Sequence, residues 1–226
     1  MTSIKQFIFI ILAATLTLSA CTNSSQNAST TTAQETSAAT GQEYTVDTTA
    51  SVVTWQATHK GGFAPRYGTL RLSQGSFSVD NGTITGGNFI VDVNSLLVDT
   101  ASVTEKDKKA SDLQAHLKSP EFFDAAKYPT AKFVITNVVP YDSTKVKSLT
   151  NDATHLVSGN LTIKDSTLNV TFPAKILVSD VSVNIEAKFS VDRTSWGLRY
   201  GAEGDPADWM VSKDFDLGFN VKGTAK

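Results

Sequence analysis

Hydrophobic and polar residues alternate with a period of two along several stretches of the chain. The clearest stretches are residues 52–59, 88–93, 132–136 and 214–220. In the first of them, polar residues separate Val53, Trp55 and Ala57. Alternation of this kind is typical of β-strands whose two faces have different surroundings. The pattern therefore predicts a mostly β domain.

Turn signals separate these stretches. They include Gly61-Gly62, Asp80-Asn81-Gly82, Gly86-Gly87 and Lys164-Asp165-Ser166. An Asn-Gly pair between two alternating segments is a strong signal for a tight hairpin. Pro173 lies inside an otherwise strand-like segment, and proline cannot donate a hydrogen bond to a sheet ladder. We expect a sheet edge or a bulge at that position.

One stretch in the middle of the chain has a helical pattern instead. Residues 104–107 have the form of a capping box, and Ala110, Leu113 and Leu117 then fall on one helical face. Ser119-Pro120 suits the start of a further short turn. About eight antiparallel strands with one short helical insert predict a barrel or a sandwich.

The N-terminus has the pattern of an export signal. Lys5 precedes an uncharged, largely apolar run from Phe7 to Leu18, and Leu18-Ser19-Ala20-Cys21 follows. A charged start, an apolar segment of about a dozen residues and a small-residue cleavage site are typical of a signal peptide. The tetrad resembles a bacterial lipobox, so we predict a signal peptide over residues 1–20 and a diacylated Cys21. An ordinary secretory signal is the alternative.

Residues 21–43 have the composition of a tether. From Thr22 to Glu43 the chain contains no aromatic residue and no aliphatic residue larger than Ala. Such a segment buries too little apolar surface to offset its ordering entropy, so we expect it to be disordered. With Thr22 after the cysteine, the interpretation is attachment to the outer membrane, facing the periplasm.

The remaining residues 44–226 are expected to form one folded domain. The chain has a net charge of -2, and removal of residues 1–20 takes away Lys5 and no acid, which leaves -3. This charge argues against nucleic acid as a partner. The single cysteine is assigned to the lipid, so no disulfide and no thiolate metal site are expected.

Enzyme motifs are missing from the sequence. The three histidines, His59, His116 and His155, form no zinc-protease motif, and the chain has no nucleophile elbow or P-loop. Asp112 and His116 are one helical turn apart, which we interpret as a capping or surface pair rather than a metal or acid/base site. We predict no catalytic residues, no metal and no cofactor.

Three segments carry a resemblance to a known family. They are His116–Phe133, Val157–Asp165 followed by Val170–Ala174, and Val191–Leu198, the last containing Asp192-Arg193-Thr194-Ser195-Trp196. Together they resemble the YceI-like family of exported lipid-binding proteins. The resemblance extends from residue 44 to 222.

The resemblance implies a lipocalin-like, eight-stranded antiparallel barrel with a helix near one end. It also implies a lumen that takes an isoprenoid or a similar long amphipathic chain, and it is compatible with a homodimer. An eight-stranded barrel is wide enough for one slender ligand if its side chains leave room.

Aromatic residues are the candidates for the wall or the mouth of such a lumen. The candidates are Phe63, Phe77, Phe89, Phe122, Phe123, Phe133, Phe189, Trp196 and Phe215. Alternation alone does not identify the inward face, and for each residue simple core packing is the alternative.

A polar head group is expected at the mouth. Its candidate partners are His59, Arg66, Arg193 and Arg199. Arginine binds phosphate through two parallel hydrogen bonds, which favours it over lysine. The alternative for Asp192-Arg193 is an ordinary strand-end or surface pair.

Two functions are compatible with the sequence. The first is a membrane-anchored lipid-binding protein that sequesters or transports its ligand. The second is a barrel with a packed lumen whose loops bind a protein or a glycan in stress or adhesion. Packing within the lumen separates the two.

Overall fold

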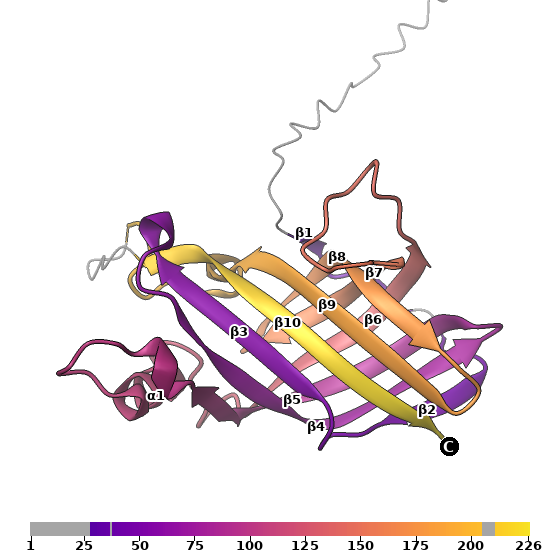
Figure 1. Cartoon of the computed structure of the whole chain (residues 1–226), viewed down its shortest axis with the longest axis horizontal. Coiled ribbons are helices and arrows are strands. Elements are labelled where there is room, and N and C mark those ends of the chain that lie inside the picture. The colour runs from indigo at the N-terminus through magenta and orange to yellow at the C-terminus, as the bar shows by residue number, and fades with distance from the viewer. Residues whose placement is uncertain (1–27, 37, 205–210) are drawn as a thin grey trace, which may run out of the picture.

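The computed structural model describes residues 28–36, 38–204 and 211–226. The predicted signal peptide and Cys21 lie outside these residues. Strands account for most of the described chain (Figure 1). The strands are β1 (Ser29–Thr32), β2 (Gln42–Val46), β3 (Val52–His59), β4 (Arg66–Asp80), β5 (Thr83–Val98), β6 (Thr130–Pro140), β7 (His155–Ile163), β8 (Ser166–Val178), β9 (Ser182–Asp192) and β10 (Val211–Ala225).

Helical elements are short and lie in the connections. They are the 3₁₀ turns η1 (Lys60–Gly62), η2 (Thr100–Ser102) and η3 (Arg193–Trp196), and the α-helix α1 (Ala110–Lys118).

The eight strands from β3 to β10 form a closed antiparallel barrel. Each pairs with the next in sequence, and β10 pairs back with β3 from His59 to Val52. The fold prediction is therefore confirmed, and the barrel is the correct choice over the sandwich.

The predicted hairpin lies between β4 and β5, where Asn81 and Gly82 both have positive φ. Such a pair of positive φ angles matches the twist of the flanking strands.

β2 and β3 together fill one position of the barrel wall. Both strands lie between β4 and β10. β2 pairs with the C-terminal parts of β4 and β10, whereas β3 pairs with their N-terminal parts. A turn interrupts the strand between β2 and β3. It begins at Asp47, whose carboxylate accepts hydrogen bonds from the Thr49 amide at 2.9 Å and the Ala50 amide at 3.0 Å. This local turn competes with the strand and explains the break.

The two ends of the barrel differ (Figure 1). At one end, here called the mouth, lie η1, α1, the β7–β8 turn and η3. At the other end lie the β4–β5 turn, the β8–β9 turn and the C-terminal end of β10.

The helix begins later than predicted. α1 starts at Ala110 with Lys109 as its N-cap, and no side chain caps it. The predicted capping box at residues 104–107 is wrong, because these residues precede the helix and Lys109, not Thr104, is the N-cap. Ser119 ends α1, and its hydroxyl accepts a hydrogen bond from the Glu121 amide at 3.3 Å, in the predicted turn.

The predicted tether is partly ordered. β1 pairs antiparallel with β8, from Ser29 opposite Thr171 to Thr32 opposite Leu168. It lies on the side of β8 that β9 leaves free, since β9 pairs with β8 only from Ala174 onward. The prediction of disorder is therefore wrong for this segment, whose backbone hydrogen bonds replace the missing apolar burial.

Pro173 lies where the partner of β8 changes from β1 to β9. A proline is tolerated there because no continuous ladder runs past it on that side. The predicted sheet edge is confirmed at this position.

Candidate functional site

A cavity of about 540 Å³ occupies the mouth half of the barrel. Its volume is within the range of roughly 300–1,000 Å³ that is typical of small-molecule sites. The lining is mainly apolar and comes from β3, β4, β5, β6, β7 and β10, together with α1 and the segments around it.

The alternating faces of two strands show how the sequence builds the wall. On β10, Phe215, Leu217 and Phe219 all line the cavity, and so do Trp55 and Ala57 on β3. Residues two apart on a strand lie on one face, so a single alternating pattern supplies a continuous apolar wall. The small Ala57 leaves room where a larger side chain would close the lumen.

Aromatic rings fill the other half of the barrel. We call them the aromatic plug: Tyr44, Phe77, Phe89, Phe133, Phe172, Phe189 and Phe219. The closest pair is Phe172 and Phe189, stacked with ring centroids 4.0 Å apart. Only Phe133 and Phe219 of this set also line the cavity, so these two rings form its floor.

The segment around α1 covers part of the mouth. Leu113 and Leu117 from the helix line the cavity, as do Phe122 and Phe123 from the turn that follows it. Leu113 and Leu117 are four residues apart, which puts them on one helical face. The helical pattern in the sequence thus supplies the apolar inner surface of this cover.

Polar side chains lie at the rim. Asp107, Lys108 and Asp112 contribute to the lining. The Nδ1 of His116 lies 3.2 Å from the Glu121 carboxylate, so its partner is Glu121 rather than Asp112. The cavity therefore has an apolar interior and a charged entrance, an arrangement suited to an amphipathic molecule.

His116 also belongs to an aromatic cluster at the rim. Its ring contacts Tyr200 at 4.6 Å and Phe122 at 5.1 Å between centroids, both edge to face. Edge-to-face contacts are the favoured geometry for such rings. The cluster joins α1 and the turn after it to the segment after η3.

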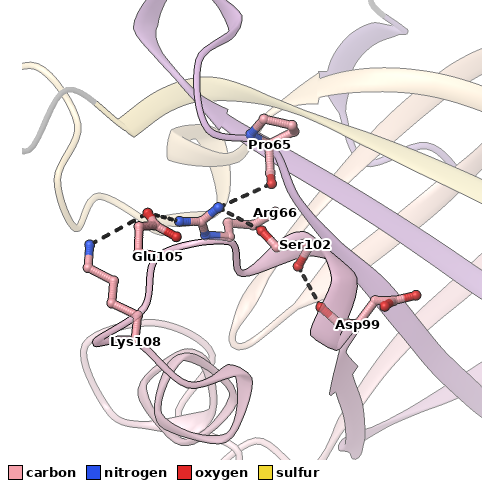
Figure 2. A network of polar contacts seen from close by, with 6 residues as sticks. All are labelled: Pro65, Arg66, Asp99, Ser102, Glu105 and Lys108. Atoms are coloured by element: carbon pink, nitrogen blue, oxygen red, sulfur yellow. Dashed lines mark hydrogen bonds and ion pairs between the residues drawn. The ribbon is translucent and has the colours of Figure 1, made fainter.

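Arg66 fastens the segment between β5 and α1 to the start of β4 (Figure 2). Its guanidinium donates to the Ser102 carbonyl at 2.7 Å and pairs with the Glu105 carboxylate at 2.5 Å. The hydroxyl of Ser102 in turn donates to the Asp99 carbonyl at 2.7 Å. These contacts hold residues 99–105 against the rim of the barrel.

The surroundings of the Glu105 carboxylate lower its pKa. A hydrogen bond from its own backbone amide, together with the Arg66 guanidinium, holds the pKa of Glu105 below its ordinary value. A hydrogen bond to the charged form stabilises that form, which is the physical cause of the shift.

The predicted aromatic residues occupy four different positions. Phe122, Phe123, Phe133 and Phe215 line the cavity, whereas Phe77, Phe89 and Phe189 belong to the buried aromatic plug away from it. Trp196 is buried beside the β7 backbone, where its indole N–H donates to the Leu161 carbonyl at 3.0 Å. Phe63 is 73% exposed on the loop outside the mouth.

The predicted head-group residues also differ in position. His59 and Arg66 line the cavity, and the Nδ1 of His59 is buried with no hydrogen-bond partner among the residues that the structure describes. Arg199 is exposed and does not line the cavity.

Arg193 lines the cavity but is itself engaged. It is only 4% exposed, and its guanidinium donates to the carbonyls of Leu198, Ser212 and Val211. These bonds join η3 to the start of β10, so Arg193 holds the rim together. Its neighbour Asp192 forms an ion pair with Lys213 at 3.1 Å.

Aliphatic wall residues were not among the predicted candidates. They include Leu70, Val91, Leu96, Leu161 and Leu217. Trp55 and Phe219 were also missed, although both fall in register with Ala57 and Phe215 in the alternating stretches. That register is the signal that could have identified them.

The described ranges contain neither a metal-binding cluster nor a membrane-spanning helix. No cluster of three or more metal-ligating side chains occurs in the described ranges. Within the same ranges, no helix has the length and apolar character needed to cross a membrane.

Fold and cavity together define an antiparallel eight-stranded barrel with an apolar pocket that reaches one end. The chain belongs to the family with a YceI-like domain, which matches residues 44–223. A UPF0312 protein from Pseudomonas putida is 33% identical over 185 residues, covering 80% of this chain and 85% of that protein. Protein YceI from Salmonella arizonae is 31% identical over 137 residues, covering 60% of this chain and 62% of that protein.

Solved structures share the fold. BcnA from Burkholderia cenocepacia superposes with a TM-score of 0.57 at 17% identity, covering 78% of this chain and 98% of that one. A polyisoprenoid binding domain from Saccharophagus degradans, implicated in plant cell wall breakdown, gives a TM-score of 0.53 at 14% identity and covers 81% of this chain and 98% of that one. The family resemblance inferred from the sequence is confirmed.

Proposed function

We propose that this protein binds one isoprenoid, or a similarly long amphipathic lipid, in the cavity of the mouth half. The observation that carries the proposal is the cavity of about 540 Å³ with an apolar wall and a charged rim. Burial of a hydrocarbon chain is favourable by roughly 25 cal/mol for each Å² of apolar surface removed from water. The polyisoprenoid binding domain among the similar structures supports the same ligand class.

The head group of the ligand would lie at the rim. His59 offers a buried ring nitrogen without a partner among the described residues, and Lys108 and Lys109 add positive charge to the entrance. A quinone or phosphate group would find hydrogen-bond donors there, while the chain extends toward Phe133 and Phe219. No residue of the site has to react with the ligand.

The cellular setting is part of the proposal. We infer from Leu18-Ser19-Ala20-Cys21 that the protein is exported and lipid-anchored through Cys21, at the outer membrane facing the periplasm. There it would sequester or transport its lipid. The alternative function, binding of a protein or glycan through the loops, assumed a fully packed lumen. Only the half of the lumen that contains the aromatic plug is packed in this way.

Tryptophan fluorescence tests ligand binding directly. Trp55 lines the cavity, and its indole N–H donates to the Leu97 carbonyl at 3.2 Å, so a bound chain would change its surroundings. Titration of the protein with geranylgeraniol should change the emission in a saturable way. Trp55→Phe should remove most of the change.

A blocked cavity provides the matched comparison. Ala131 lines the cavity on β6, and its neighbour Thr130 is exposed on the same strand. Ala131→Phe should weaken binding at least about tenfold, because the added ring occupies the space of several buried methylene groups. Thr130→Phe should bind as the unchanged protein does. Equal binding by both variants would contradict a ligand in the lumen.

A further inference from the structure

The cavity ends at a wall of rings in the middle of the barrel. Phe219 contacts Phe133 at 6.3 Å, Phe172 at 5.8 Å and Phe189 at 5.4 Å between centroids. Phe172 and Phe189 lie behind it and do not line the cavity. Removal of the Phe219 side chain would therefore extend the cavity toward these two rings.

Glycine residues on the neighbouring strands leave space for the aromatic rings of the plug. A Cβ atom on Gly159 of β7 would overlap the Phe133 ring, and one on Gly223 of β10 would overlap the Phe77 ring. Two strands thus carry glycine where an aromatic ring of the plug packs against them. Any side chain at these positions would force the rings to move, so the plug is a packed part of the fold.

We infer that the floor formed by Phe133 and Phe219 limits the length of the chain that the cavity can bury. The inference rests on the proposed function and adds a specificity-determining role for these two residues. As an order-of-magnitude measure we assign each carbon atom about 30 Å³, the share of volume that one water molecule has in the liquid. A cavity of about 540 Å³ then holds on the order of 20 carbon atoms, or four isoprene units.

A limit of this kind has a measurable signature. With the head group at the rim and the chain against the floor, each isoprene unit up to the fourth gains buried apolar contact. Further units stay outside the mouth in water and gain nothing. Affinity should rise by at least about tenfold from three to four units and by less than about twofold beyond four.

The test measures binding of prenyl alcohols with three, four, five and eight isoprene units to the full chain and to two variants. Phe219→Ala removes a ring from the floor. Phe123→Ala removes the same ring from the cover at the mouth, where Phe123 also lines the cavity. Both residues are partly buried, which makes the pair a matched comparison.

In the unchanged protein and in Phe123→Ala, the five-unit alcohol should bind no better than the four-unit alcohol. In Phe219→Ala it should bind at least about tenfold better, since the missing ring leaves space for about one more unit. Phe219→Leu provides a milder variant of the same kind, and thermal unfolding of each variant checks that it is folded.

The outcomes are distinct. An affinity that continues to rise beyond four units in the unchanged protein, or a folded Phe219→Ala with the same length preference, would overturn the role of the floor while leaving lipid binding intact. A failure of all alcohols to bind to the unchanged protein would overturn the proposed function, and the inference with it.

Discussion

The two halves of the barrel are built from the same strands and the same alternating pattern, but they differ in what the inward side chains do. In the half away from the mouth, large rings meet: Phe172 and Phe189 stack at 4.0 Å, and both are almost fully buried. In the mouth half, inward residues such as Ala57, Ala131 and Val91 are smaller, and a cavity remains. Side-chain volume, and not secondary structure, therefore separates a core from a binding site in this fold.

The largest expected effect lies in the aromatic plug. Phe172→Ala should lower the free energy of unfolding by about 3–5 kcal/mol, because the cavity left among closely packed rings cannot collapse. Phe123→Ala at the mouth should cost about 1 kcal/mol or less, since that ring already faces an open space. Denaturant unfolding of both variants measures the difference. Similar losses would show that the two halves do not differ as proposed.

A smaller loss of stability is expected when a side chain is added at Gly159, next to the aromatic plug. Gly159→Ala should destabilise the protein by about 1–3 kcal/mol, because the new methyl group overlaps the Phe133 ring. Phe133→Leu added to Gly159→Ala should recover part of the loss if the overlap is its cause. A double variant whose losses simply add would refute this explanation. Denaturant midpoints of the two single variants and the double variant complete the cycle.

The strands and the cavity lining differ in how well the sequence predicted them. The alternation around Trp55 and Phe215 correctly predicted strands, because a period of two needs no tertiary information. It could not tell that Phe133 lines the cavity whereas Phe89, its partner across the β5–β6 pair, does not. That difference depends on where along the barrel each ring lies, which is decided when the sheet closes.

Polar contacts account for the local errors. Thr104 and Asp107 have the spacing of a capping box, but the helix starts later, and Glu105 between them pairs with Arg66, 39 residues away in the chain. Local spacing carries no information on such a contact. Residues 29–32 lack apolar side chains, yet their backbone pairs with the free side of β8. Pairing through the backbone leaves little trace in side-chain composition, so a disordered tether was the natural prediction.

Acidic pH should destabilise residues 99–105 at the mouth without affecting the aromatic plug. The pKa of Glu105 is lower in the folded protein than its ordinary value. The contact with Arg66 therefore stabilises residues 99–105 above the ordinary pKa of a glutamate, and it is lost as the pH falls through the lowered value. Hydrogen exchange of the Val103 amide, corrected for the intrinsic effect of pH, should become faster on acidification.

Glu105→Gln is the control for this effect. The variant should exchange faster at neutral pH and lose the pH dependence, since an amide does not titrate in this range. Amides in β9, such as that of Phe189, should be unaffected in both proteins. A pH dependence that persists in Glu105→Gln would assign the effect to another group.

The smallest effect is expected at the N-terminal strand. Thr31→Pro should disturb the pairing of β1 with β8, where Thr31 lies opposite Asn169, because proline has no N–H and is poorly tolerated within a paired strand. Cleavage of the N-terminal segment by a protease should become faster, while the midpoint of global unfolding should change little. Thr31→Ala keeps the donor and should behave as the unchanged protein. Equal cleavage rates for the two variants would argue against the pairing.

Native mass spectrometry of the full chain, purified from a bacterial host and combined with lipid extraction, tests the central claim most directly. We expect a one-to-one adduct with the mass of an isoprenoid or a similar amphipathic lipid, and the loss of that adduct in Ala131→Phe but not in Thr130→Phe. A protein that is free of lipid as purified, and remains so after incubation with geranylgeraniol, would contradict the claim that the mouth half is a lipid site.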